Sequence, residues 1–244
     1  MRIGILKTDS VRPEFQREFG DYPAMFRQAL ATVADAEPVE FRDYDVQHGE
    51  YPRDIDECDA YLITGSRDSV YDELPWLEEL KSFVKVLDAA QHPLVGICFG
   101  HQLIAHELGG ETRAAARGWA VGVHEADVIE PAGWMQPFRP SFRLLSSHKD
   151  QVVKLPPRAR PFAANEFCPH GGFTIDRHII TFQGHPEFVK GYSRALMDAR
   201  KEILGDEVYS KGVASLDQMI DAPLVARWIL NFLAQSRDER VIGR

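Results

Sequence analysis

Short apolar runs alternate with longer stretches of helical periodicity through the first half of the chain. Residues 3–6, 60–63 and 94–97 are apolar runs of strand length. Residues 21–36 and 75–87 between them repeat apolar side chains at helical spacing. Strands that alternate with helices form parallel β-α-β units with right-handed crossovers. The pattern therefore predicts an α/β fold, with an open and mostly parallel sheet flanked by helices.

The second half of the chain has more closely spaced strand patterns. They fall at residues 120–128, 143–153, 162–164, 173–175 and 179–182, whereas the strand pattern at residues 39–46 belongs to the alternating first half. Asp176 and Arg177 form a short turn between the last two runs, which is the spacing of a hairpin. We therefore expect additional antiparallel strands in this half.

Helical periodicity returns at the carboxyl-terminal end, around residues 192–204 and over residues 223–235. The chain has no Pro/Ser-rich linker and no internal repeat that would mark a boundary. We expect a single domain over residues 1–244, with residues 190–244 as a helical extension.

The charge composition limits the partners. The chain has 37 acidic and 28 basic residues, a formal net charge of −9, and no basic run. This balance argues against nucleic acid and membrane partners. The first apolar run is too short for a signal peptide, and no run approaches the roughly 18 apolar residues of a membrane span. We expect a cytoplasmic protein.

Three cysteines, Cys58, Cys98 and Cys168, are widely spaced and include no C-x-x-C pair. This spacing indicates neither a disulfide framework nor a zinc site. We expect no metal and no cofactor, and thiols that stay reduced.

Cys98 lies between two glycines, in Gly96-Ile97-Cys98-Phe99-Gly100. A strand pattern precedes it and a helical pattern follows, which is the context of the G-x-S-x-G nucleophile elbow with cysteine in place of serine. The helix amino terminus favours negative charge and hence a thiolate. The alternative is a buried small hydrophobe, the usual fate of a free cysteine. The two glycines and the strand-to-helix context favour the nucleophile.

A candidate base for this thiol follows the last strand pattern. Gly184-His185-Pro186-Glu187 comes directly after Gln183, where that strand ends. The carboxylate of Glu187 can hold the imidazole of His185 in one tautomer. Taken alone, the segment is more typical of a loop histidine in an ordinary turn.

Two further polar segments, residues 63–72 and 146–152, lie next to predicted strands. Gly65 in the first allows backbone N–H groups to approach a ligand closely, as an oxyanion hole requires. The second contains Ser147 and His148, whose polar groups can anchor a small polar substrate. Each is also compatible with a turn stabilised by local hydrogen bonds.

Together, these segments resemble the class I (triad) glutamine amidotransferase family, in particular the amidotransferase domain of GMP synthetase and its stand-alone relatives. The matching residues lie within 3–189 and are Gly65-Ser66, Ser69-Val70-Tyr71-Asp72, Pro75-Trp76, Gly96-Ile97-Cys98-Phe99-Gly100-His101-Gln102, Ser147-His148-Lys149-Asp150 and Gly184-His185-Pro186-Glu187. The chain departs from a complete GMP synthetase in having no glycine- and serine-rich phosphate loop.

The resemblance implies roles for individual residues. The catalytic residues would be Cys98, His185 and Glu187. The backbone N–H groups of Gly65 and Phe99 would form the oxyanion hole. Three more residues would line the pocket for the amino-acid end of glutamine: Gln102, Ser147 and His148.

The resemblance also implies a reaction. Cys98 would attack the side-chain amide of glutamine and form a γ-glutamyl thioester, and its hydrolysis would give glutamate and ammonia. Since the chain has no visible place to use ammonia, a separate synthase subunit would accept it. A γ-glutamyl peptide or conjugate hydrolase with the same triad is the alternative. A non-catalytic regulatory relative is a third, and the presence of all three triad residues argues against it.

Overall fold

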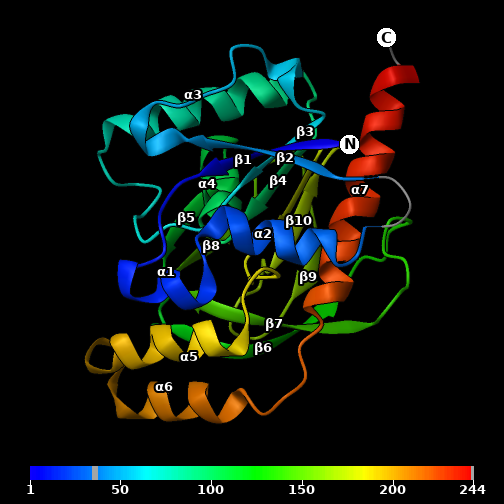
Figure 1. Ribbon diagram of the computed structural model, residues 1–244. Helices are drawn as coiled ribbons and strands as arrows, with labels where there is room; N and C mark the ends of the chain where they lie inside the picture. The colour runs from blue at the N-terminus through cyan, green and yellow to red at the C-terminus, as the bar shows by residue number, and fades with distance from the viewer. Residues whose placement is uncertain (35–37, 243–244) are drawn as a thin grey trace.

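The computed structural model describes residues 1–34 and 38–242. A nine-stranded sheet runs through the protein in the order β2-β1-β3-β4-β11-β10-β9-β6-β7 (Figure 1). Its strands are β1 (Arg2–Lys7), β2 (Glu40–Asp45), β3 (Ala60–Ile63), β4 (Leu94–Ile97), β6 (Ala120–Val128), β7 (Ser141–His148), β9 (Ala159–Ala164), β10 (Gly172–Ile175) and β11 (Ile179–Phe182). A separate two-stranded sheet pairs β5 (Glu111–Ala114) with β8 (Asp150–Lys154).

The sheet divides into a parallel and an antiparallel part. Strands β2, β1, β3, β4 and β11 pair in parallel. From β11 outwards, β10, β9, β6 and β7 pair antiparallel. The sequence-based expectation of a mostly parallel sheet with antiparallel strands in the second half is confirmed, and the carboxyl ends of β3, β4 and β11 meet at one edge.

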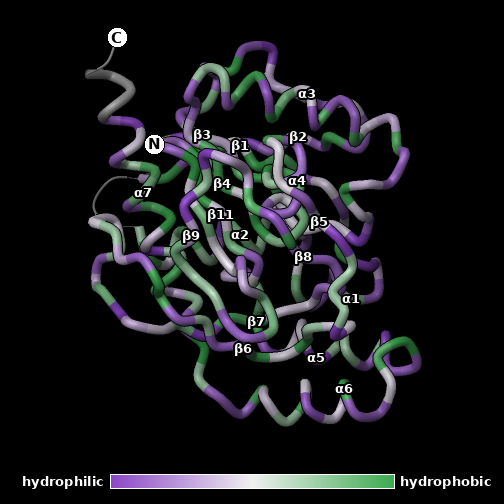
Figure 2. The backbone as a smooth tube through the Cα atoms, turned by 180° about the vertical axis from the view of Figure 1, so that it is seen from behind, coloured by the Kyte–Doolittle hydropathy of each residue, from purple (hydrophilic) through white to green (hydrophobic). Residues whose placement is uncertain are grey.

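Helices cover both faces of the sheet. They are α1 (Pro13–Phe19), α2 (Tyr22–Ala31), α3 (Pro75–Ala89), α4 (Phe99–Glu107), α5 (Lys190–Ala199), α6 (Lys201–Ser215) and α7 (Ala222–Ile242), with short 3-10 turns η1 (Val46–His48) and η2 (Ile55–Glu57). The side chains of α2 and α7 pack on one face, and those of α3 and α4 pack on the other. Figures 1 and 2 show α3 at one end of the molecule and α5 with α6 at the opposite end.

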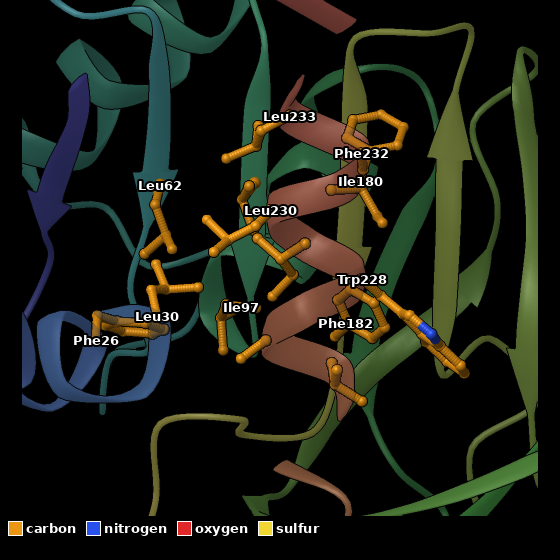
Figure 3. Close-up of a cluster of buried hydrophobic side chains, with 14 of the residues drawn as sticks. Phe26, Leu30, Leu62, Ile97, Ile180, Phe182, Trp228, Leu230, Phe232 and Leu233 are labelled. Carbon is orange, nitrogen blue, oxygen red and sulfur yellow. The ribbon is translucent and has the colours of Figure 1, made fainter. Parts of the chain in front are cut away.

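The last helix is part of the main hydrophobic core. Trp228, Ile229 and Leu233 on α7 are fully buried in one cluster with Ile97 of β4 and Phe182 of β11. Figure 3 shows α7 lying across these strands, with its apolar side chains directed at them. The two strands that lead into the site therefore depend on this helix for much of their packing. No helix in the described residues has the length and apolar character needed to cross a membrane.

Several boundaries differ from the expectations. The single strand expected over residues 143–153 is wrong: β7 and β8 are separate strands that pair with different sheets. The chain changes pairing partner here: His148 is the last residue paired with β6, Lys149 lies in neither strand, and Asp150 pairs with Ala114 of β5. The helix expected around residues 192–204 is interrupted at Arg200, whose backbone leaves the helical region (φ −114°, ψ 11°).

Helix α1, strand β5 and most of helix α6 were not expected from the sequence, which predicted two carboxyl-terminal helices where the structure has three. Helix α1 buries none of its residues fully, and β5 is largely polar, so neither has a strong apolar pattern. Helix α2 matches the beginning of the helix expected over residues 21–36, whose last two residues lie outside the described part of the chain.

Candidate active site

Cys98 occupies the sharp turn between β4 and α4. Its backbone has φ 52° and ψ −99°, a conformation that costs energy for any residue with a side chain. Two hydrogen bonds hold the turn: the Cys98 amide donates to the Phe182 carbonyl at 2.9 Å, and the Cys98 carbonyl accepts from the Gln102 amide at 3.0 Å. A strained backbone kept in place by its surroundings is characteristic of an elbow that presents a nucleophile.

The glycines on either side of Cys98 are required by close packing. A Cβ added to Gly96 would lie 2.7 Å from the backbone of Gly100. A Cβ added to Gly100 would lie 2.6 Å from the Ile63 carbonyl oxygen on β3. Both contacts are shorter than side chains tolerate, so the G-x-C-x-G spacing follows from the packing of β3, β4 and α4.

Strand pairing brings the end of β11 beside Cys98. Since β11 runs parallel to β4, with Phe182 opposite Ile97, the next residue on each strand leaves the sheet at the same edge. The Gln183 side-chain amide lies 3.6 Å from the Cys98 sulfur. Two residues later, the His185 amide donates to the Leu145 carbonyl on β7 at 2.8 Å and so fixes the backbone of His185.

The imidazole of His185 is held on several sides. Its Nδ1 lies 2.7 Å from Glu187 Oε1, and both side chains are almost completely buried. The ring of Phe188 stacks on the imidazole, with the centroids 3.8 Å apart and an angle of 10° between the planes. A Cβ added to Gly65 would lie 3.1 Å from His185 Cε1 and 3.7 Å from Cys98 Cβ. The thiol and the imidazole therefore both adjoin Gly65.

The electrostatic environment of His185 favours its charged form. Burial lowers the pKa of this imidazole, but the carboxylate of Glu187 and the sulfur of Cys98 outweigh that effect and raise the pKa to about 10. The second ring nitrogen, Nε2, is buried and has no hydrogen-bond partner among the described residues. An imidazolium with one nitrogen bound to a carboxylate and the other unengaged can deliver a proton next to Cys98.

A network of hydrogen bonds fixes the loop that follows β3. The Thr8 hydroxyl donates to the Gly65 carbonyl at 2.9 Å. Asp9, which is 5% exposed, accepts from the backbone amide of Arg67 at 3.0 Å and from its guanidinium at 2.7 Å. The backbone amides of Gly65 and Phe99 are the two groups expected to form the oxyanion hole. Within residues 1–34 and 38–242, neither amide donates a hydrogen bond to a backbone carbonyl.

The three residues expected to bind substrate are differently engaged. Gln102 donates its side-chain amide to the Asp150 carbonyl at 2.7 Å and to Gln183 Oε1 at 3.2 Å. The Ser147 hydroxyl accepts from the guanidinium of Arg200 at 2.8 Å. His148 is buried, and its Nδ1 donates to the Asp150 carbonyl at 3.0 Å. Burial lowers the pKa of His148 to about 3, so its ring is neutral near pH 7.

A small cavity of about 30 Å³ adjoins the same edge of the sheet. His148, Gln183, Gly184 and Cys168 are among the residues that line it. Among the described residues, no group of three or more His, Cys, Asp or Glu side chains is arranged to hold a metal ion.

Sequence reasoning missed the residues that support the site. Phe188 follows the expected triad directly in sequence, but its stacking on His185 depends on how the chain turns after β11. Asp9 and Arg67 lie on different loops, and Arg200 meets Ser147 across 53 residues of chain. The only local signal was the position of Asp9 and Arg67 just after apolar strand patterns, where polar side chains gather at the carboxyl edge.

Comparison with known proteins places this geometry in a family. The model of the class I glutamine amidotransferases matches residues 25–200. The chain belongs to this family. It is 31% identical to gamma-glutamyl peptidase 2 of Arabidopsis thaliana over 212 residues, which are 83% of this chain and 84% of the relative. It is 33% identical to a glutamine-hydrolyzing GMP synthase subunit of Sulfolobus acidocaldarius over 135 residues, 55% of this chain and 70% of that protein.

Solved structures of other amidotransferases share the fold. A glutamine amidotransferase from Thermotoga maritima superposes with a TM-score of 0.72 at 20% identity, covering 98% of both chains. The shared fold therefore covers 98% of this chain and continues past residue 200, where the family-model match ends.

Proposed function

We propose that this protein hydrolyses the amide bond of γ-glutamyl compounds, with Cys98 as the nucleophile and His185 and Glu187 as its acid–base partners. The observation that carries the proposal is the strained elbow at Cys98, beside an imidazole that is buried against the Glu187 carboxylate. Membership of the amidotransferase family and the similarity to a gamma-glutamyl peptidase support the same chemistry.

The reaction would proceed through a thioester. The sulfur of Cys98 bonds to the γ-carbonyl carbon, and the amides of Gly65 and Phe99 would stabilise the negative charge on the oxygen. The carbon–nitrogen bond breaks as the imidazolium of His185 protonates the leaving amine. Water then attacks the γ-glutamyl thioester while His185 accepts its proton, which releases the γ-carboxylate and returns Cys98.

Two leaving groups have support. An amino acid or peptide is favoured by the similarity to gamma-glutamyl peptidase 2, which extends over most of both chains. Ammonia from glutamine is favoured by the similarity to the GMP synthase protein of Sulfolobus acidocaldarius, and in that case a separate synthase subunit would accept the ammonia. We favour the peptide, because the peptidase match covers more of this chain. In either case the substrate is a small molecule.

A substrate panel tests the proposal. Purified protein and its Cys98→Ala variant would be assayed with glutamine and with γ-glutamyl dipeptides. Cys58→Ala would serve as the matched cysteine control, because Cys58 is also buried but lies beside Tyr44, away from the site. We expect hydrolysis of the dipeptides by the wild type and by Cys58→Ala, and none by Cys98→Ala. Hydrolysis by Cys98→Ala would exclude the assigned nucleophile. Turnover of glutamine only after addition of a synthase would favour the second leaving group.

A third possibility, a regulatory relative without activity, makes a distinct prediction. Such a protein would leave Cys98 unmodified by 6-diazo-5-oxonorleucine, an electrophile that mimics glutamine. Mass spectrometry of the treated protein would detect the adduct on Cys98 that the proposed function requires.

A further inference from the structure

Arg200 is a half-buried cation close to the candidate site. It lies between α5 and α6, where the chain leaves the helical conformation. Among the described residues, its guanidinium forms no ion pair with a carboxylate. A partly buried guanidinium that is not paired with a carboxylate is available to bind an anionic ligand.

The surroundings of Arg200 hold it in one orientation. Its Nη1 donates to the Ser147 hydroxyl at 2.8 Å, and its guanidinium lies over the ring of Trp119, 5.4 Å from the centroid. Stacking on an aromatic ring leaves the edge of the guanidinium fork open to an anion. The Ser147 oxygen accepts from Arg200, so the hydroxyl hydrogen is available for donation to the same anion.

Strand geometry places this pair beside the candidate base. On β7, Leu145 and Ser147 are two residues apart and share one face of the strand. The Leu145 carbonyl accepts the amide of His185, and its side chain packs with Phe188 and Tyr192. Ser147 therefore lies about 6.6 Å along β7 from Leu145, whose carbonyl accepts the hydrogen bond from the backbone of His185.

Ring packing connects the helix that ends at Arg200 to the candidate base. The ring of Tyr192 on α5 packs edge-on against Phe188, with the centroids 4.8 Å apart, and Phe188 stacks on His185. Arg200 caps the carboxyl-terminal end of the same helix.

We propose that Arg200 and Ser147 together bind the α-carboxylate of the γ-glutamyl substrate. The inference rests on the proposed function and assigns the residues that recognise the glutamyl end. In a γ-glutamyl compound the α-carboxylate carbon is four bonds from the reacting carbonyl carbon, on the order of 5 Å when the chain is extended. That distance is the same whatever the leaving group, so one fixed cation can recognise the glutamyl end of every such substrate.

The test compares substrates that differ only in this carboxylate. γ-Glutamyl-glycine and 4-aminobutanoyl-glycine have the same scissile bond and the same amine, but the second lacks the α-carboxylate. We expect Arg200→Gln to lower kcat/KM for γ-glutamyl-glycine about 10- to 100-fold, mainly through KM, because a charged hydrogen bond is lost. With 4-aminobutanoyl-glycine, Arg200→Gln and the wild type should react equally.

Arg194→Gln is the matched control, because Arg194 lies on α5 and is exposed and paired with Asp198. It should behave as the wild type with both substrates. Equal losses by Arg200→Gln with both substrates would mean that Arg200 only maintains the fold and would overturn the inference. A loss that follows the glycine carboxylate instead, seen by comparing γ-glutamyl-glycine with γ-glutamyl-glycinamide, would overturn it by assigning Arg200 to the leaving group.

A binding measurement separates this inference from the proposed function. Calorimetry would compare glutamate and 4-aminobutanoate on the wild type and on Arg200→Gln. A wild type that hydrolyses no γ-glutamyl compound would exclude the proposed function. Stronger binding of glutamate by the wild type, lost in Arg200→Gln, would still support the carboxylate site, and equal binding by both proteins would exclude it.

Discussion

Two buried histidines flank the same strand, and each is hydrogen-bonded to a carboxylate. His178 immediately precedes β11 and lies 2.9 Å from Asp88. His185 follows β11 and lies 2.7 Å from Glu187. Burial lowers the pKa of His178 and prevails over Asp88, whereas the pKa of His185 is raised to about 10.

The difference lies in what else the carboxylates contact. Asp88 also accepts hydrogen bonds from the guanidinium of Arg158, which opposes protonation of the neighbouring His178. Glu187 has its second oxygen buried without a partner among the described residues, and the Cys98 sulfur adds to its effect on His185. The two pairs thus differ in two respects that matter for proton transfer. At His185 the carboxylate has no other hydrogen-bond partner among the described residues, and a nucleophile is near.

The largest effect expected from this comparison is in the paired substitutions His185→Asn and His178→Asn. Loss of the acid–base group at the site should reduce kcat/KM for a γ-glutamyl dipeptide by about 10⁴-fold. His178→Asn should keep kcat/KM within a few-fold of the wild type. Steady-state kinetics would measure both, and a comparable loss in the two variants would contradict the distinction between the two ends of β11.

Substitution of the two carboxylates should likewise affect activity at Glu187 and stability at Asp88. Glu187→Gln should lower kcat about 10²- to 10⁴-fold, since the amide neither fixes the productive tautomer nor stabilises the imidazolium. Asp88→Asn should instead lower the free energy of unfolding by about 1–3 kcal/mol, because it weakens the bonds to His178 and Arg158. Denaturant titration and kinetics on both variants would show whether activity and stability separate in this manner.

The pH dependence of activity should sharpen the contrast. With the pKa of His185 raised to about 10, the imidazolium is retained at neutral pH and lost as the pH rises through that value. We therefore expect kcat/KM to fall about tenfold per pH unit above pH 10. In Glu187→Gln the decline should begin at a lower pH, because the main group that raises this pKa is removed. A decline at the same pH in both proteins would refute the assignment to His185.

The smallest effect concerns the aromatic ring that supports His185. Phe188→Leu should lower kcat several-fold with little change in KM, since a stacked pair contributes about 0.5–1.5 kcal/mol to holding the imidazole. Phe173, whose ring centroid is 4.9 Å from that of His101, offers the matched control. Phe173→Leu should reduce stability and leave kcat unchanged, and an equal loss of kcat in both variants would mean that general loosening of the core is responsible.

How well the sequence predicted the fold depended on how strongly each segment is buried. The runs of β3, β4 and β11 were predicted with their observed bounds, because each is apolar throughout and buried on both faces. Helix α1 was missed because it contributes only partly buried side chains. The break between β7 and β8 could not be predicted, since it depends on the pairing of β8 with β5, a largely polar strand that was itself not predicted.

The residues of the candidate site also differed in how far the sequence could predict them. Cys98 and the segment from Gly184 to Glu187 were recognisable because tight turns at strand ends impose local residue preferences. The pairing of Asp9 with Arg67 and of Ser147 with Arg200 joins distant parts of the chain without a local pattern. Local sequence therefore indicated the reacting groups, whereas their supports required the folded arrangement.

The burial of α7 against β4 and β11 has a consequence for synthesis of the protein. A ribosome makes the cysteine elbow and the histidine loop well before it makes Trp228 and Leu233, whose side chains complete the core behind both strands. The nascent chain cannot close that core until these late residues leave the exit tunnel. Cys98 and His185 should therefore reach their paired arrangement only after residue 233 has left the tunnel.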